Sequence, residues 1–451
     1  MGLITGASAL EVAAQIVRES PAAETEVTLE HGLERFARFA AEGPTQSADR
    51  ERHEFAVRVR LDEGGGLREA RASVAGNSLA DGRRALARAI ELARFAPVNP
   101  ELVPMGGAVD VRETFAPPQT LAHSFEEKAR WIRAALAACE TAELEPAGLI
   151  QSTALARAIV NSRDRAVFGQ TGRHGFSLTA SGGGGAGLAQ SFGAEPDQVD
   201  HASVIRKAVD KALASRAPLA LEPGEYPVVL EPLAVSAILL FAAYQGFGAR
   251  EVEEQSSFLC GRDGARLWPA ALSITDDPQN PLMPALAFDG EGTPKSTVKL
   301  VDSGRLCAPV TDRHYARRRG TSSTGHAQAQ PAVCGPAPQN MVVASGNSSL
   351  EELIAGIERG LLVSQFHYTN AIDSKELLLT GMTRNGTFLI EGGRVVRAVK
   401  NLRFTQSLLE ALAGLTDLGR TGEAAGALFD GEIVTPPMSL ARFRFTSSTD
   451  F

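Results

Sequence analysis

A predominantly apolar segment at residues 226–249 constrains the fold of this chain more than any other feature. It reads Tyr-Pro-Val-Val-Leu-Glu-Pro-Leu-Ala-Val-Ser-Ala-Ile-Leu-Leu-Phe-Ala-Ala-Tyr-Gln-Gly-Phe-Gly-Ala. The pattern predicts a short buried strand that leads directly into a helix. Its best apolar run, residues 233–243, is too short to span a bilayer, so no membrane partner is expected.

Length and composition indicate a soluble protein with a substantial core. A chain of 451 residues is long enough for two or three domains. Hydrophobic residues make up 44% and aromatic residues only 6%, so the core must consist mainly of Ala, Leu and Val. The 44 glycines imply many turns and close backbone approaches, which favours a β-rich portion.

The charge pattern argues against a nucleic-acid partner. The formal net charge is -8, whereas a protein that follows phosphate backbones usually carries a basic stripe. The densest basic run, residues 312–319, precedes the polar tract 320–325 and is predicted to be a mobile surface loop.

The cysteines and the N-terminus indicate a cytoplasmic protein. The four cysteines are widely spaced and form no C-x-x-C pair, so they are expected to be reduced thiols rather than zinc ligands. The first residues lack the basic start and long apolar run of a signal peptide.

The N-terminal part, residues 1–110, combines helix and strand patterns. Residues 8–19 have the periodicity of an amphipathic helix, followed by short alternating runs. Residues 57–61 alternate as a strand with one wet face, and residues 67–74 return as a hairpin partner. We expect an α+β domain with a small antiparallel sheet.

Two further regions follow along the chain. Residues 111–220 combine a helix, for which Ser124 is the N-cap and Glu127 the third residue, with several strand-like runs. Residues 221–451 contain the apolar segment and then many short strands and turns, which predicts a large β-rich C-terminal domain. The predicted fold class is therefore α+β.

A glycine-rich stretch at residues 180–190 has the spacing of a phosphate-binding loop. Gly182, Gly184 and Gly187 match G-x-G-x-x-G, but the residues that follow are a poor helix start and no Walker lysine is present. We therefore predict a flexible glycine loop.

Carboxylates and histidines offer little evidence for a metal site. Asp276, Asp277, Asp289 and Glu291 could bind a hard cation such as calcium, but Asp-Pro and Asp-Gly pairs are also ordinary turn formers, and turns are favoured. No two of the eight histidines lie three or four residues apart, which excludes a two-histidine helix site. A site assembled from residues distant in sequence stays open.

A series of short motifs follows the apolar segment. They are Glu-Gln-Ser-Ser-Phe-Leu-Cys-Gly-Arg-Asp-Gly at 254–264, Ser-Ile-Thr-Asp-Asp-Pro at 273–278, Phe-Asp-Gly-Glu-Gly-Thr-Pro at 288–294, Leu-Val-Asp-Ser-Gly-Arg-Leu at 300–306, Ser-Thr-Gly at 323–325 and Asn-Ser-Ser-Leu-Glu-Glu-Leu-Ile at 347–354. In their order and spacing, residues 226–363 resemble the TldD/PmbA family. The N-terminal half fits the layout of that family with weaker motifs.

The resemblance implies a paired system. Members of the TldD type carry His-Glu-x-x-x-His on the helix after the buried strand, together with a cysteine near the C-terminus, and bind a metal for peptide hydrolysis. Here the three positions are Phe241, Ala242 and Gly246, and the last cysteine is Cys334. If the match shifts by one residue, the positions become Leu240, Phe241 and Gln245. Neither set can hold a zinc ion or relay a proton.

The departure from the TldD pattern points to the TldE/PmbA type. The resemblance then implies a non-catalytic subunit of a heteromeric metallopeptidase, without metal ligands or a cofactor of its own. It would help to form a peptide-binding chamber for unfolded or leader peptides, with zinc held by a TldD-type partner. The residues expected to contact substrate are Ser256, Ser257, Asp289, Glu291 and His326.

Two other functions stay open at this point. The chain could be a hydrolase with a relocated site that uses Asp289, Glu291 or His326. It could also be a binding or regulatory protein, a homodimer without peptidase activity, which the description of the family as a modulator of DNA gyrase suggests.

Overall fold

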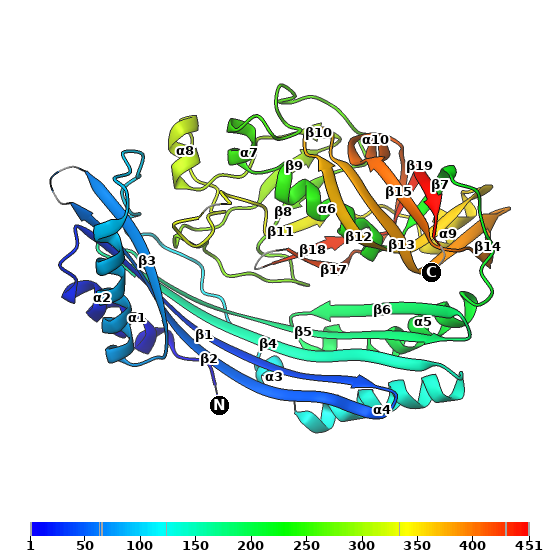
Figure 1. Ribbon diagram of the computed structural model, residues 1–451, viewed down its shortest axis with the longest axis horizontal. Coiled ribbons are helices and arrows are strands. Elements are labelled where there is room, and N and C mark those ends of the chain that lie inside the picture. The colour runs from blue at the N-terminus through cyan, green and yellow to red at the C-terminus, as the bar shows by residue number, and fades with distance from the viewer. Residues whose placement is uncertain are drawn as a thin grey trace.

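A long, curved antiparallel sheet lies beneath a β-rich C-terminal region in the computed structural model (Figure 1). The structure describes residues 2–62, 64, 66–122, 124–332, 334–428 and 431–449. The strand order of the first sheet is β3-β2-β1-β4-β5-β6. Its strands are β1 (Glu24–Ala40), β2 (Gly43–Asp62), β3 (Leu67–Ala75), β4 (Glu145–Asn161), β5 (Ala166–Gly182) and β6 (Gly185–Gly193).

The helices of the N-terminal half pack against one face of this sheet. They are α1 (Gly6–Glu19), α2 (Leu79–Phe95), α3 (Pro118–Ala122), α4 (Phe125–Thr141) and α5 (His201–Ala214), with a short 3-10 turn at Pro196–Gln198. Ser124 and Glu127 form a capping box at the start of α4, as the sequence predicts. Residues such as Val57 and Val59 of β2 point into the core beneath α1 and α2 because side chains alternate along a strand.

The other face of the sheet carries charged side chains beside a small apolar cluster around Ile159 and Val167, because the residues between the core positions point the opposite way. Arg58 pairs with Glu26 at 2.9 Å, and Arg60 pairs with Glu24 at 2.7 Å. All four side chains are less than 10% exposed. This face meets the C-terminal region, since Arg173 of β5 forms an ion pair with Glu432. Buried charges are stable only when they are paired in this way.

The C-terminal region contains two further sheets. The first has the strand order β10-β9-β8-β11-β18-β17. The second has the order β12-β7-β19-β15-β13-β14, and β12 also pairs with β13. Its remaining strand, β16, pairs with β19. The strands of the first are β8 (Ile274–Asp276), β9 (Val298–Asp302), β10 (Arg305–Leu306), β11 (Asn340–Val343), β17 (Glu423–Leu428) and β18 (Gly431–Thr435). Those of the second are β7 (Gly224–Leu230), β12 (Arg359–Asp373), β13 (Leu378–Glu391), β14 (Arg394–Ala398), β15 (Leu402–Ser407), β16 (Leu415–Leu418) and β19 (Met438–Ser448).

The apolar segment forms β7 and α6 (Pro232–Gln245), as predicted, and lies in the largest hydrophobic core. A helix that is apolar on all sides must be buried, and α6 contacts strands of both C-terminal sheets. Each fully buried side chain, such as Ile238 or Leu239, contributes roughly 1.5–3 kcal/mol to folding. The remaining helices are α7 (Ala249–Glu253), α8 (Arg313–Arg319), α9 (Leu350–Ala355) and α10 (Leu408–Ala413).

The predicted α+β class is confirmed, and the first sheet is more extended than the short alternating runs indicate. Residues 1–110 and 111–220 contribute strands to this same sheet, and the division of the chain into three domains stays a prediction. No helix in the described part of the chain is long and apolar enough to cross a membrane.

Two loop predictions are corrected by the structure. The basic run is the helix α8 rather than a mobile loop, because the Asp312 carboxylate accepts from Tyr315 N at its start and Gly320, with φ 65°, ends it. The glycine-rich stretch is a tight hairpin turn between β5 and β6. Gly183 and Gly184 both have positive φ, which is the conformation of a two-residue type I′ turn, and no helix follows to bind a phosphate.

Candidate functional site

The C-terminal end of α6 occupies the place where the resemblance puts a metal motif. Phe241 is half-buried and packs on the main core, Ala242 is 3% exposed, and Gly246 is the residue that ends the helix. Phenylalanine, alanine and glycine side chains have no atom that can coordinate zinc.

The position of Gly246 is also closed by packing. A Cβ atom built on Gly246 would lie 1.9 Å from Cε1 of Phe258, far inside van der Waals contact. Phe258 is 1% exposed and meets Phe247 edge to face, with ring centroids 5.2 Å apart. An imidazole at this position would therefore need the Phe258 ring to move out of the core.

The serines predicted to contact substrate hydrogen-bond to the backbone instead, Ser257 at the end of α6 and Ser256 at α7. The Ser257 hydroxyl donates to the carbonyl of Gly246 at 2.7 Å and accepts from Leu259 N at 2.9 Å. The Ser256 hydroxyl donates to the carbonyl of Glu251 at 3.2 Å. Ser257 is 1% exposed, so a substrate could not reach its hydroxyl in this conformation. The contact of Ser257 with substrate stays a prediction.

Asp289 organises a tight turn next to the N-terminal sheet. Its two carboxylate oxygens accept from the backbone N–H groups of Glu291, Thr293 and Ala327, each at 2.9 Å. Three N–H donors occupy the positions that a cation would need, so the turn interpretation agrees with the geometry better than calcium binding. Burial raises the pKa of Asp289.

Asp276 and His326 form a buried pair beside this turn. His326 Nε2 lies 3.1 Å from Asp276 Oδ1, and neither side chain is exposed. The other Asp276 oxygen accepts from Gln339 N and Asn340 N, at 2.6 and 2.8 Å. Burial alone would raise the pKa of Asp276, but His326 and the backbone donors lower it below its usual value. The pair joins three segments of the loop region and has no open side for a substrate.

Glu291 is the predicted site residue with the most perturbed carboxyl group. It lies 7% exposed between the charged face of the sheet and α8, and Arg313 N is 3.5 Å from its Oε2. Burial raises the pKa of Glu291 to about 7, and the neighbouring Asp289 adds to this rise, whereas Arg58 and Arg313 oppose it. The group is therefore close to half-protonated at neutral pH.

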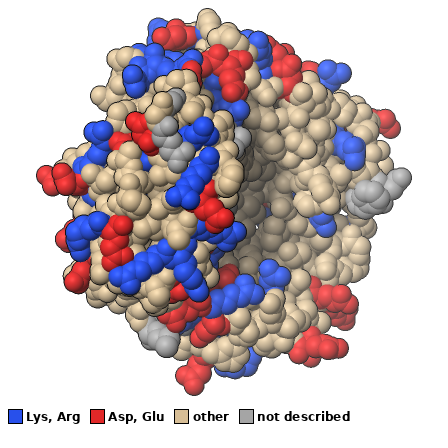
Figure 2. Space-filling model, turned by 60° about the vertical axis from the view of Figure 1, so that its left-hand side comes forward, with Lys and Arg blue, Asp and Glu red and all other residues tan. Residues whose placement is uncertain are grey.

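A cavity of about 620 Å³ lies between the N-terminal half and the C-terminal region. It is lined by residues of β6 and α5, by the start of α6, and by Glu423, Ala424 and Ala425 of β17. Both β6 and β17 are edge strands of their sheets. The chain is also hollowed on the face shown in Figure 2, where Lys and Arg side chains lie along one rim of the hollow. Sequence reasoning missed the cavity because its lining comes from segments far apart in the chain.

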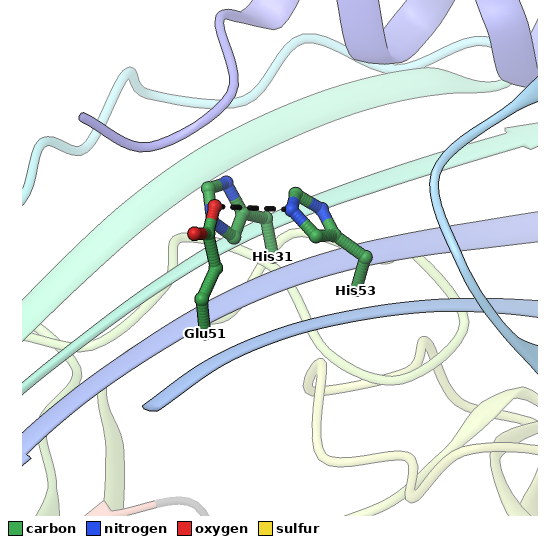
Figure 3. Close-up of side chains that lie close together, drawn as sticks. All are labelled: His31, Glu51 and His53. Atoms are coloured by element: carbon green, nitrogen blue, oxygen red, sulfur yellow. Dashed lines mark hydrogen bonds and ion pairs between the residues drawn. The ribbon is translucent and has the colours of Figure 1, made fainter. Parts of the chain in front are cut away.

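One cluster of possible metal ligands is present in the described residues. His31 of β1 lies opposite His53 of β2, and both imidazoles lie beside the Glu51 carboxylate (Figure 3). His31 Nε2 and His53 Nε2 are 3.0 and 3.2 Å from Glu51 Oε1. The hairpin register of β1 and β2 brings the histidines together, and the short runs predicted from the sequence did not reveal that register.

The geometry of this cluster does not suit a metal ion. A bound metal would lie in both imidazole planes, but the rings are stacked 3.9 Å apart and only 24° from parallel, so those planes do not meet within bonding distance. Ile4 N donates to His31 Nδ1 at 2.9 Å, which leaves the proton of a neutral ring on Nε2, the nitrogen a metal would need. The cluster is better described as a carboxylate shared by two histidines.

Comparison with known proteins agrees with the fold and the motifs. Residues 223–447 match the family described as PmbA/TldA metallopeptidase C-terminal domain. This chain belongs to the TldD/PmbA family. A metalloprotease TldD homolog from Buchnera aphidicola is 26% identical over 257 residues, which cover 54% of this chain and 52% of that protein. A metalloprotease PmbA homolog from Haemophilus influenzae is 26% identical over 230 residues, covering 50% and 48%. The matched part spans about half the length of these relatives.

Solved structures show that the likeness extends over the whole fold. The crystal structure of TldE from Thermococcus kodakarensis superposes with a TM-score of 0.83 at 18% identity, covering 97% of this chain and 100% of that one. A protein from Thermotoga maritima described as a modulator of a DNA gyrase gives a TM-score of 0.81 at 18% identity, covering 94% and 96%. The TldD/PmbA fold thus includes the N-terminal sheet as well as the C-terminal region.

A double-mutant cycle tests the closure of the Gly246 position. Gly246→His should lower the free energy of unfolding by about 1–3 kcal/mol or more, because the new side chain overlaps Phe258. Phe258→Ala should cost about 3–5 kcal/mol on its own. The double variant should lose less than the sum of the two, measured by urea denaturation. Strictly additive losses would contradict the predicted overlap.

The perturbed carboxyl of Glu291 predicts a pH-dependent stability. A carboxyl whose pKa rises on folding contributes stability below its unfolded pKa, and this is lost as the pH rises through about 7. In Glu291→Gln the free energy of unfolding should therefore decline less between pH 4.5 and about 7. Loss of one proton can make this decline as steep as about 1.4 kcal/mol per pH unit. Denaturation midpoints across this range measure it. The exposed Glu358→Gln is the control, and an equal effect in both variants would refute the assignment.

Proposed function

We propose that this chain is a non-catalytic, TldE-type subunit that pairs with a metal-bearing subunit of the TldD type in a heteromeric peptidase. The observation that carries the proposal is the C-terminal end of α6. There the three motif positions lack ligand atoms, and the Phe258 ring fills the space beside Gly246. Peptide hydrolysis would then depend on zinc held by the partner, with no cofactor in this chain.

The cavity supports a role in holding the peptide. Edge strands carry backbone N–H and C=O groups that can pair with an extended chain, and such pairing accepts many sequences. Both β6 and β17 reach the cavity from opposite halves of the chain. Lys211 and Glu231 line it as well and pair with each other at 2.7 Å, so its wall is polar without a strong net charge. An unfolded or leader peptide fits these properties.

Co-expression with a His-Glu-x-x-x-His homologue tests the pairing. We expect the two chains to co-elute in size-exclusion chromatography and peptidase activity to require both. A partner variant in which the motif glutamate is replaced by glutamine is the control and should bind equally well without cleaving. If the chains stay separate and this chain elutes as a homodimer, the regulatory alternative is favoured. Activity of this chain alone that is lost in Asp289→Asn or His326→Gln would favour the relocated hydrolase.

A matched pair of variants in the reconstituted complex tests the peptide route. Ala214→Trp adds a large side chain on α5 at an exposed position that lines the cavity, whereas Ala202→Trp adds one to an exposed position of α5 outside the lining. Only the first should weaken cleavage, several-fold or more, because it fills space that the peptide needs. Equal rates for both complexes would show that peptide does not pass through this cavity.

A further inference from the structure

A second cavity, of about 380 Å³, lies between the N-terminal half and α8, and three arginines line it. Arg165 comes from the turn between β4 and β5, and Arg313 and Arg317 lie one helical turn apart on α8. The hydroxyl-bearing Thr321 and Ser322 follow the helix and complete the wall. None of these residues belongs to the α6 site or to the larger cavity.

In the described part of the chain, no carboxylate accepts a hydrogen bond from the guanidinium groups of these three arginines. Arg165 donates from Nε to the carbonyl of Gly107 at 3.0 Å, and from Nη1 to the carbonyl of Glu291 at 2.9 Å and to Thr293 Oγ1 at 3.0 Å. Arg313 donates to the carbonyl of Pro104. These acceptors are neutral, so they position the guanidinium groups without cancelling their charge. Arg58 and Arg60 of the neighbouring sheet, in contrast, each pair with carboxylates.

The surroundings leave the positive charge under-compensated. Arg165 is 4% exposed, and burial together with the like charge of Arg313 lowers its pKa. Arg317, Thr321 and Ser322 are exposed, and in the described part of the chain no hydrogen bond or ion pair joins their side chains to another side chain. The carboxyl groups of Asp289, Glu26 and Glu291 act on Arg165 through space, and none of them accepts a hydrogen bond from its guanidinium group. Guanidinium forks and hydroxyls facing one cavity are the donor set that binds oxyanions.

We propose that the cavity formed by Arg165, Arg313 and Arg317 is a binding site for a small oxyanion group, a phosphate or a carboxylate. The site is independent of the proposed pairing with a TldD-type subunit, since it uses none of the residues on which that proposal depends. It gives the chain a second ligand-binding site, outside the larger cavity.

Calorimetric titration of the full-length chain with inorganic phosphate at constant ionic strength tests this site. We expect saturable binding at one site per chain, weakened about tenfold or more in Arg317→Gln, because one charge-assisted contact is lost. Arg319→Gln is the matched control: it removes the same charge from an exposed position of the same helix outside the cavity. It should bind phosphate as the unchanged protein does. Absence of saturable binding, or equal weakening in both variants, would overturn the proposal.

A competition arm separates the two sources of the oxyanion. A short peptide with a free C-terminal carboxylate and the same peptide with an amidated C-terminus are added to the phosphate complex. Displacement by the free acid alone identifies a carboxylate ligand, whereas displacement by neither identifies phosphate as the preferred group. Equal displacement by both peptides would place their binding outside oxyanion recognition and would contradict the assigned chemistry.

Discussion

Burial of most of α6 in the main core is the constraint on which the rest of the C-terminal region depends. The helix has no polar face, so strands of both C-terminal sheets must cover it. Its end is sealed by Phe258 against Gly246 and by the Ser257 hydroxyl on the Gly246 carbonyl. A metal centre at this place would require polar ligands and an open coordination position. The packing that stabilises the fold here therefore leaves no room for a ligand side chain at Gly246.

The N-terminal sheet buries charged side chains on one face and apolar side chains on the other. Helices cover one of its faces with an apolar core, and the other face carries charged side chains that are buried against the C-terminal region. Arg58 and Glu26 of this face pair with each other, whereas beside α8 the guanidinium groups of Arg165 and Arg313 are held by neutral acceptors. Structural ion pairs and a candidate ligand site thus lie side by side on this interface, and the difference between them is whether a carboxylate accepts a hydrogen bond from the guanidinium group.

The sequence predicted the parts of the structure that depend on local patterns. The strand and helix at 226–249, the β2–β3 hairpin and the capping box at Ser124 follow from periodicity and from residues close in the chain. It could not predict how far strands would extend, because a long curved sheet depends on pairing between distant segments. The α8 helix was missed although Asp312 and Gly320 are good end signals, because its arginines suggested an exposed loop.

The same distinction applies to the candidate sites. The lack of metal ligands on α6 was visible in the sequence, but the steric closure of Gly246 required the position of Phe258. Asp289, Asp276 and His326 were singled out for their chemistry, and the structure shows backbone donors and a buried pair around them. Both cavities and the His31–Glu51–His53 cluster form only through tertiary contacts, so their residues carried no local signal.

The central claim is that this chain contributes structure and peptide binding while its partner holds the metal. Zinc analysis of the purified chain and of its complex with a TldD-type subunit tests that claim most directly. We predict zinc in the complex, in proportion to the partner, and no stoichiometric zinc in the chain alone. One tightly bound zinc ion per isolated chain would contradict the account.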